Sequence, residues 1–153
     1  MKRDSRLSGI LHVLLHMAEA GQPLTSEQLA QAMQSNAAVV RRILGGLRNR
    51  EMVRSEKGHG GGWTLACDLS AITLRDIYEA IGAPRLMAMS NRTEAPGCLV
   101  EQAVNAALDS SFSEAETLLL TRFEQVTLAA LAADFHARMA ARSSTPKKET
   151  PDG

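Results

Sequence analysis

The feature that most constrains how this chain can fold is a pair of short helical segments joined by a polar turn. Thr25 and Gln28 form the T-x-x-Q pattern of a capping box, which starts the first helix. The polar turn at residues 34–36 ends that helix, and a second helix is expected from about residue 37 to about residue 50. Two helices joined by so short a polar turn are typical of a helix-turn-helix.

The second of these helices has an apolar stripe and a basic face. The stripe consists of Val40, Ile43, Leu44 and Leu47. The other face carries Ala38, Arg41, Arg42, Gly45 and Arg48. Small residues allow a helix to enter a groove of DNA closely, and arginines contact phosphates or guanine edges. A solvated basic face on an ordinary surface helix is the alternative interpretation.

A glycine-rich hairpin is expected directly after the second helix. Residues 52–55 and 62–66 are typical of two short strands, and residues 57–61 form the turn between them. Glycines supply the positive φ angles that such a turn requires. A hairpin in this place is the wing of a winged helix-turn-helix, with Lys57 and His59 at its tip.

The motifs for catalysis and for metal binding are incomplete. The string HGGG at residues 59–62 occurs in esterase oxyanion loops, but the G-x-S-x-G nucleophile elbow is missing. The phosphate-loop motif is missing as well, and Trp63 breaks the dinucleotide-binding glycine pattern. His12 and His16 share a helix face, but their HVLLH stretch lacks the glutamate of zinc proteases, and no third ligand is apparent. We therefore expect neither an enzyme nor a metal site.

The second half of the chain predicts a loop followed by a long helix. Residues 83–97 contain two prolines and no sustained period, which is typical of a loop. From Cys98 to about residue 125 apolar residues recur at helical spacing, which gives a helix about 42 Å long at about 1.5 Å per residue. A small domain cannot cover so long a helix, so it predicts a dimer interface. A helix pair bent at Ser110-Ser111 is the alternative.

The expected fold is mainly α with a small β-hairpin wing, in the form of a winged helix-turn-helix plus a long dimerisation helix. The helix-turn-helix and wing occupy residues 1–82, and the loop occupies 83–97. Dimerisation helices are expected at 98–141, and a polar, disordered tail at 142–153.

Charge and cysteine content also bear on the class of protein. The net charge is zero, but residues 1–66 hold nine Lys and Arg against five Asp and Glu, whereas residues 67–153 hold eight against twelve. This asymmetry indicates different roles for the two halves, and chance is the alternative explanation. Cys67 and Cys98 are the only cysteines and form no disulfide framework, which predicts a reducing cytoplasm. No run of about 18 apolar residues is present, so no membrane span is expected.

Several stretches of the chain together carry a family resemblance. They are NAAVVRRILGGLR, KGHGGGWTLA, ITLRDIYEAIG, and GCLVEQAVNAAL followed by FEQVTLAAL. The chain thereby resembles the Rrf-two family of winged-helix transcriptional regulators, which includes IscR, NsrR and CymR, from about residue 6 to about residue 140. The last two stretches are most similar to the YwnA-like subgroup.

The resemblance implies a homodimer that binds a palindromic operator in double-stranded DNA, and we expect it to act as a repressor. The family's recognition helix maps onto residues 37–48, and its wing onto residues 57–62. The DNA-binding candidates are Ser35, Asn36, Ala38, Arg41, Arg42, Arg48, Lys57 and His59. A winged-helix adaptor that binds proteins instead of DNA is the alternative, which the zero net charge favours.

The segment that senses a signal in this family departs from the family pattern. Cluster-binding members have three cysteines after the wing, whereas here Cys98 matches the first and none follows it. Iron–sulfur clusters take four protein ligands, so neither a cluster nor another cofactor is expected. Cys98 is a candidate redox sensor, because a helix N-terminus favours a thiolate, or it is a plain helix-start residue. A small-molecule effector near the 83–97 loop is the other candidate signal.

Overall fold

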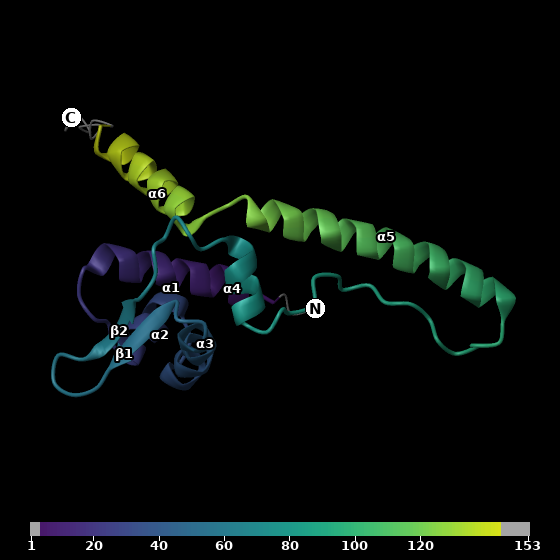
Figure 1. The fold of residues 1–153 in the computed structure, drawn as a ribbon, viewed down its shortest axis with the longest axis horizontal. Coiled ribbons are helices and arrows are strands. Elements are labelled where there is room, and N and C mark those ends of the chain that lie inside the picture. Colours follow the sequence, from purple (N-terminus) through teal and green to yellow (C-terminus); the bar gives the residue numbers. More distant parts are fainter. Residues whose placement is uncertain (1–3, 145–153) are drawn as a thin grey trace, which may run out of the picture.

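The computed structural model describes residues 4–144 of the chain. The elements in that part are α1 (Arg6–Ala20), α2 (Ser26–Met33), α3 (Ala37–Asn49), β1 (Val53–Glu56), β2 (Gly62–Leu65), α4 (Leu74–Ala80), α5 (Leu99–Glu124) and α6 (Leu128–Ser143). Helices dominate, and β1 and β2 form an antiparallel hairpin (Figure 1). The expected fold class, mainly α with a small hairpin wing, is confirmed.

The turn between α2 and α3 is held by side chains that close the helix ends. The Thr25 hydroxyl accepts a hydrogen bond from the Gln28 amide at 3.2 Å, and the Gln28 side chain accepts one from the Thr25 amide at 2.8 Å. Gln34 ends α2 in a left-handed conformation with a φ of 51°. The Asn36 side chain then caps α3 by accepting a hydrogen bond from the Val39 amide at 3.0 Å. These caps satisfy backbone groups that would otherwise lack partners, so the predicted helix ends are well defined.

The wing is anchored to the domain at its base. β1 pairs with β2, and Val53 lies opposite Leu65. β1 begins and ends one residue later than the sequence predicts, and β2 ends one residue earlier. Trp63 and Leu24 exchange backbone hydrogen bonds of 2.8 and 3.1 Å. Gly62 has a φ of 151°, and a Cβ on it would lie 2.6 Å from the Leu24 carbonyl oxygen. Glycine is therefore required where the wing meets the segment before α2.

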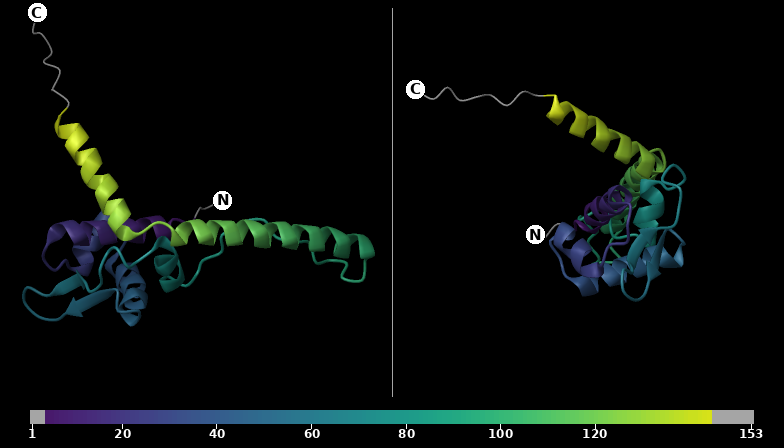
Figure 2. Two further views of the ribbon diagram at one scale, coloured as in Figure 1. Left: turned by 45° about the horizontal axis from the view of Figure 1, so that its top comes forward. Right: turned by 90° about the vertical axis from the view of Figure 1, so that its left-hand side faces the viewer.

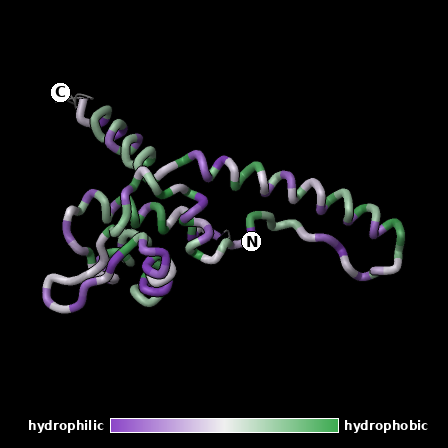
Figure 3. The backbone as a smooth tube through the Cα atoms, in the orientation of Figure 1, coloured by the Kyte–Doolittle hydropathy of each residue, from purple (hydrophilic) through white to green (hydrophobic). Residues whose placement is uncertain are grey.

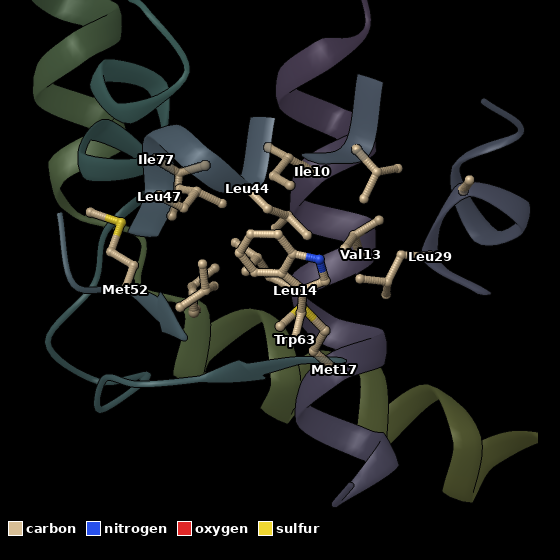
Figure 4. Packing of buried hydrophobic residues seen from close by; sticks show 14 residues of the cluster. Ile10, Val13, Leu14, Met17, Leu29, Leu44, Leu47, Met52, Trp63 and Ile77 are labelled. Carbon is tan, nitrogen blue, oxygen red and sulfur yellow. The ribbon is translucent and has the colours of Figure 1, made fainter. Parts of the chain in front are cut away.

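The core lies between α1, α3 and the hairpin. Trp63 of β2 lies among the other buried apolar side chains of this core (Figure 4). Its indole Nε1 donates a hydrogen bond to the buried Ser26 hydroxyl at 3.0 Å. On α3, three of the four predicted stripe residues are buried, whereas Ile43 is only half-buried at the edge of the core. The fully buried side chains include Ile10, Val13, Leu14, Leu29, Val40, Leu44, Leu47, Ile77 and Leu128.

α4 joins this domain to the long helix α5. The Tyr78 ring of α4 meets the Phe123 ring of α5 edge-on, with centroids 6.1 Å apart. The Arg75 guanidinium forms an ion pair with Glu124. The Tyr78 hydroxyl also donates a hydrogen bond to the Pro84 carbonyl at 2.6 Å, which ties the start of the following loop to α4. The C-terminal end of α5 is thus fixed to the domain by apolar, ionic and loop contacts.

α5 extends well away from the rest of the molecule (Figures 1 and 2). Its 26 residues span about 39 Å at about 1.5 Å per residue. It continues through Ser110 and Ser111 as one helix, so the alternative of a bent helix pair is wrong. The loop at 83–97 contains no helix or strand and runs back along α5, where the Asn105 amide donates a hydrogen bond to the Arg92 carbonyl at 2.7 Å.

α5 carries apolar side chains that no other part of residues 4–144 covers. None of its residues is buried, and apolar segments recur along it (Figure 3). Val100, Val104, Leu108 and Leu118 lie within an arc of about 80°, at about 100° per residue, so they share one face. Its exposed large apolar residues are Leu99, Val100, Val104, Leu108, Leu118 and Leu119.

α6 closes the described part of the chain. The Thr127 hydroxyl caps it by accepting a hydrogen bond from the Ala130 amide at 3.1 Å. It ends at Ser143, so it includes the first two residues of the segment expected as a tail, while residues 145–153 lie outside the described residues. Within residues 4–144 no helix combines the length and the apolar character needed to cross a membrane.

Candidate nucleic-acid interface

The start of α3 presents a small, exposed surface. Ser35, Asn36 and Ala38 are all exposed there, and the Ser35 amide donates a hydrogen bond to the Ala30 carbonyl at 2.9 Å. The Asn36 side-chain oxygen caps the helix, so its amide nitrogen is the group of this side chain that is left to donate a hydrogen bond to another molecule. Because Ala38 has only a methyl side chain, this end of α3 is able to approach another molecule closely.

Arg41, in the first half of α3, is held by a carboxylate of the neighbouring helix. Its Nη2 lies 2.8 Å from Oε1 of Glu27 on α2, and the two side chains are 56% and 65% exposed. Ion pairs this exposed contribute roughly 0–1 kcal/mol. The guanidinium is therefore oriented by α2, in an ion pair weak enough for another anion to replace Glu27. Glu27 is absent from the residues predicted from the sequence, because no motif links it to a partner 14 positions away.

Arg42 and Arg48 lie on opposite edges of the basic face. Arg42 lines a hollow of about 140 Å³ between α3 and α4. Arg48 points toward the wing, where its Nη1 lies 3.5 Å from the Ser55 hydroxyl and its Cζ lies 5.9 Å from the centre of the Trp63 ring. A guanidinium over an indole ring is favoured by cation–π attraction. The two arginines thus flank the face that Ala38 and Arg41 occupy.

Arg54 of β1 extends this basic surface onto the wing. It is exposed, and together with Arg48 it lines a hollow of about 440 Å³ between the end of α3 and β1. Glu51 also lines this hollow, so the two arginines leave an excess of one positive charge, which favours an anion there. Arg54 is absent from the residues predicted from the sequence. Strand alternation was the available signal, because it turns Val53 toward the core and Arg54 outward.

Lys57 and His59 lie apart from α3, at the exposed tip of the wing. The turn projects from the domain, as Figures 1 and 2 show. Gly58 and Gly60 make it possible with φ angles of 96° and 78°. The structure therefore divides the predicted residues into two groups: residues 35–48 gather along α3, and the two tip residues stand on the separate hairpin.

The two cysteines have different surroundings. Cys67 is half-buried against the core, where burial and then the charge of Asp68 raise the pKa of its thiol. Cys98 is exposed at the start of α5, and its amide donates a hydrogen bond to the Ala95 carbonyl at 2.9 Å. Among residues 4–144, no three His, Cys, Asp or Glu side chains form a group able to hold a metal ion. Cys98 is therefore the accessible thiol.

The chain also matches a known protein family. The family model described as "Rrf2: Iron-dependent Transcriptional regulator" matches residues 3–134. The chain belongs to the Rrf2 family of transcriptional regulators. The Rrf2 resemblance seen in the sequence motifs is thereby confirmed.

Individual proteins similar to this Rrf2 chain agree with that assignment. The HTH-type transcriptional regulator YwnA of Bacillus subtilis is 26% identical over 113 residues, which cover 74% of this chain and 84% of YwnA. A transcriptional regulator of Lactobacillus plantarum has a similar structure, with a TM-score of 0.72 and 24% identity over 86% of this chain and 90% of that chain. IscR of T. potens has a TM-score of 0.63 and 15% identity over 100% and 94% of the two chains.

The oxidised form of Staphylococcus aureus CymR also resembles the chain. Its TM-score is 0.63 with 17% identity, over 86% of this chain and 96% of that chain. At such identities the likeness of the solved structures concerns the fold, which is that of winged-helix regulators. The family match and the fold together give the class of the protein, a transcriptional regulator.

Proposed function

We propose that this Rrf2 protein is a homodimeric, DNA-binding repressor that acts in the cytoplasm on a palindromic operator. The observation that carries the proposal is the exposed face of α3, where Ala38 and Arg41 follow a capped helix start and arginines stand on both edges. In helix-turn-helix proteins the second helix lies in the major groove, with its first residues nearest the bases. The face has the shape and charge for that placement.

Phosphate contacts come from the edges of α3 and from the wing in this proposal. Arg42 and Arg48 flank the helix, so each suits the backbone on one side of the groove. Lys57 and His59 reach a backbone or a minor groove from the wing tip. The exposed turn at Ser35 places backbone amides of the helix start near a phosphate.

Base contacts fall to the first turns of α3. Asn36, Ala38 and Arg41 lie nearest to the base edges in this proposal. Arg41 has to leave Glu27 to bind a guanine edge, and a bidentate contact of that kind contributes about 1–3 kcal/mol of discrimination. The exposed ion pair with Glu27 costs less than this to break.

The uncovered apolar face of α5 supports the dimer in this proposal. Val100, Val104, Leu108 and Leu118 line one face of a helix that projects from its own domain. Two copies that pair along α5 cover these residues in a symmetric interface. The symmetry of such a dimer requires operator half-sites about 34–36 Å apart, or a multiple of that distance.

The experiment that tests DNA binding is a titration at several salt concentrations. The probe is the promoter upstream of the protein's own gene, compared with a random duplex of equal length. We expect the double variant Arg41→Ala/Arg42→Ala to bind at least about tenfold more weakly. We also expect its plot of log affinity against log salt to be shallower by about 2, because two phosphate contacts are lost.

The matched control is Arg85→Ala/Arg138→Ala, which removes two exposed arginines far from α3 along the chain. It has the same net charge as the test variant and is expected to bind DNA like the wild type. Equal affinities of wild type and test variant would show that α3 does not face DNA. Absence of any salt-sensitive binding to either duplex would favour the alternative, a winged-helix adaptor that binds proteins.

We infer that the signal reaches the protein without a resident iron–sulfur cluster. Each subunit offers one exposed thiol near the start of α5, Cys98, whereas Cys67 is half-buried beside the wing. Clusters take four protein ligands, so these donors do not fit one, although the family description names iron. The candidate signals are oxidation of Cys98 and a small molecule near the 83–97 loop.

A further inference from the structure

The side of α1 that faces away from the core carries two histidines whose rings converge. His12 and His16 are one helical turn apart, and both are exposed. Their Nε2 atoms are 2.9 Å apart, their ring centroids are 4.6 Å apart, and the ring planes are tilted by 46°. Two imidazole nitrogens therefore lie within hydrogen-bonding distance of each other at the surface of α1.

The distance between the two nitrogens matches what a chelated metal ion requires. Metal–imidazole bonds are about 2.0–2.1 Å long, so an ion bound to two nitrogens 2.9 Å apart subtends an angle of about 90°. That angle is typical of square-planar and octahedral ions such as Cu²⁺ and Ni²⁺, whereas a tetrahedral ion needs about 3.4 Å between the nitrogens. We propose that His12 and His16 form a two-imidazole chelate for a divalent ion of this kind.

The size of the cavity beside the pair, and one carboxylate on its wall, suit a small cation better than an organic effector. The two rings line a cavity of about 110 Å³ together with Leu15, Glu19 and Phe135. Pockets for small organic ligands are about 300–1,000 Å³, whereas an ion with two or three waters, at about 30 Å³ each, fits this space. The Glu19 carboxylate places a negative charge on the same cavity wall, which favours a cation.

The cavity lies where α1 meets α6. Phe135 comes from α6, and the neighbouring His136 places its Nε2 2.6 Å from Oε1 of Glu19. Since no group of three ligands exists in residues 4–144, the chelate has two protein ligands, and water completes the coordination. The site shares no residue with α3 or the wing, so it does not depend on the proposed DNA binding. The sequence predicts no metal site here, because ring convergence cannot be read from the spacing alone.

Chelation fixes the chemical state of both rings. Each Nε2 must offer its lone pair to the metal, so each ring carries its proton on Nδ1. In the absence of metal, one Nε2–H donates to the other Nε2, and the ion replaces that shared hydrogen. The exchange needs a change of tautomer on one ring and a turn of the rings, because both lone pairs must face the ion instead of the other ring.

The test is isothermal titration calorimetry of the full-length, tag-free protein with Ni²⁺ as the probe. We expect one ion per chain, and we expect His12→Gln or His16→Gln to weaken binding at least about tenfold, because one ligand cannot chelate. Ni²⁺ should also raise the melting temperature of the wild type but not of either variant. Both histidines are exposed, so without metal each variant should melt at the same temperature as the wild type. Either variant alone is therefore enough to test the chelate.

The controls are His59→Gln, a histidine of the wing tip, and Cys98→Ser, the exposed thiol. Both are expected to bind Ni²⁺ like the wild type. Wild-type affinity in either His12→Gln or His16→Gln would overturn the chelate. Loss of binding in Cys98→Ser alone would overturn it too, by assigning the ion to the thiol.

Discussion

At the scale of single residues, two adjacent glycines of α3 have different surroundings. A Cβ on Gly46 would lie 2.6 Å from the Ala80 carbonyl oxygen, whereas a Cβ on Gly45 would meet nothing within 4 Å. Gly46 therefore lets α3 pack closely on the end of α4. We predict that Gly46→Ala lowers the free energy of unfolding by about 1–3 kcal/mol, because backbone cannot yield cheaply to an added methyl group.

Gly45→Ala is the matched control for this prediction. Alanine in a helix is more favourable than glycine by about 1 kcal/mol, so this variant should be at least as stable as the wild type. Urea denaturation followed by circular dichroism measures both variants. Changes of equal size and direction in the free energies of unfolding of the two variants would contradict the close approach at Gly46.

The exposed thiol carries a second prediction at this scale. If Cys98 is the sensor, peroxide treatment should change the DNA affinity of the wild type by about fivefold or more, whereas Cys98→Ser should bind equally before and after treatment. Cys67→Ser is the control and should respond like the wild type, because burial and Asp68 raise the pKa of the Cys67 thiol and keep it protonated. Unchanged affinity of the oxidised wild type would end the thiol-switch hypothesis.

The sequence predicted residues whose role depends on their near neighbours in the chain, and it missed residues whose partners lie far away in the chain. Arg41 could be placed on an exposed helix face from its spacing alone. Its partner Glu27 could not, because the two meet only after α2 and α3 pack. The contact of Glu19 with His136 joins residues 117 positions apart, which no local pattern reports.

At the scale of helices and strands, local chemistry made most boundaries predictable. The capping boxes of α2 and α4 and the cap of α3 form because a hydroxyl or amide oxygen stands next to unpaired backbone amides, and this is visible in the sequence. The wing strands moved by one residue, because their ends depend on cross-strand pairing and on the contact of Gly62 with Leu24.

The loop at 83–97 shows the limit of such local reasoning. Its prolines predict a loop, but not its path. It runs back along α5 because side chains of that helix hold it, with Asn105 donating a hydrogen bond to the Arg92 carbonyl at 2.7 Å. A segment without a period of its own takes its course from the surface that it covers.

At the scale of the whole molecule, the apolar face of α5 predicts how the chain assembles. We expect the wild type to be a dimer at micromolar concentration in sedimentation equilibrium. The double variant Val104→Lys/Leu118→Lys should be monomeric, because two charges would lie in the buried centre of the interface. We expect the dissociation constant of the variant's dimer to be at least about 100-fold higher than that of the wild type, which equals about 2.7 kcal/mol.

Ala106→Lys is the control, because it adds a charge to an exposed position on another side of α5. It should remain dimeric. Since Val104 and Leu118 are 51% and 65% exposed in the single chain, the test variant should keep its helical circular dichroism spectrum. A dimeric test variant would show that α5 does not pair the subunits through this face.

The attachment of α5 to its domain has a mechanical consequence. The domain holds the helix near its C-terminal end, through Tyr78 with Phe123 and Arg75 with Glu124. A rigid rod about 39 Å long that pivots by about 5° at one end moves its other end by about 3.4 Å, which is the rise of one base pair. In the proposed dimer, a change of this angle too small to disturb the core would move the two DNA-binding domains out of register with the half-sites of a fixed operator. The joint between α4 and α5 is therefore the place in the proposed dimer where a small rotation would change which operator spacing fits.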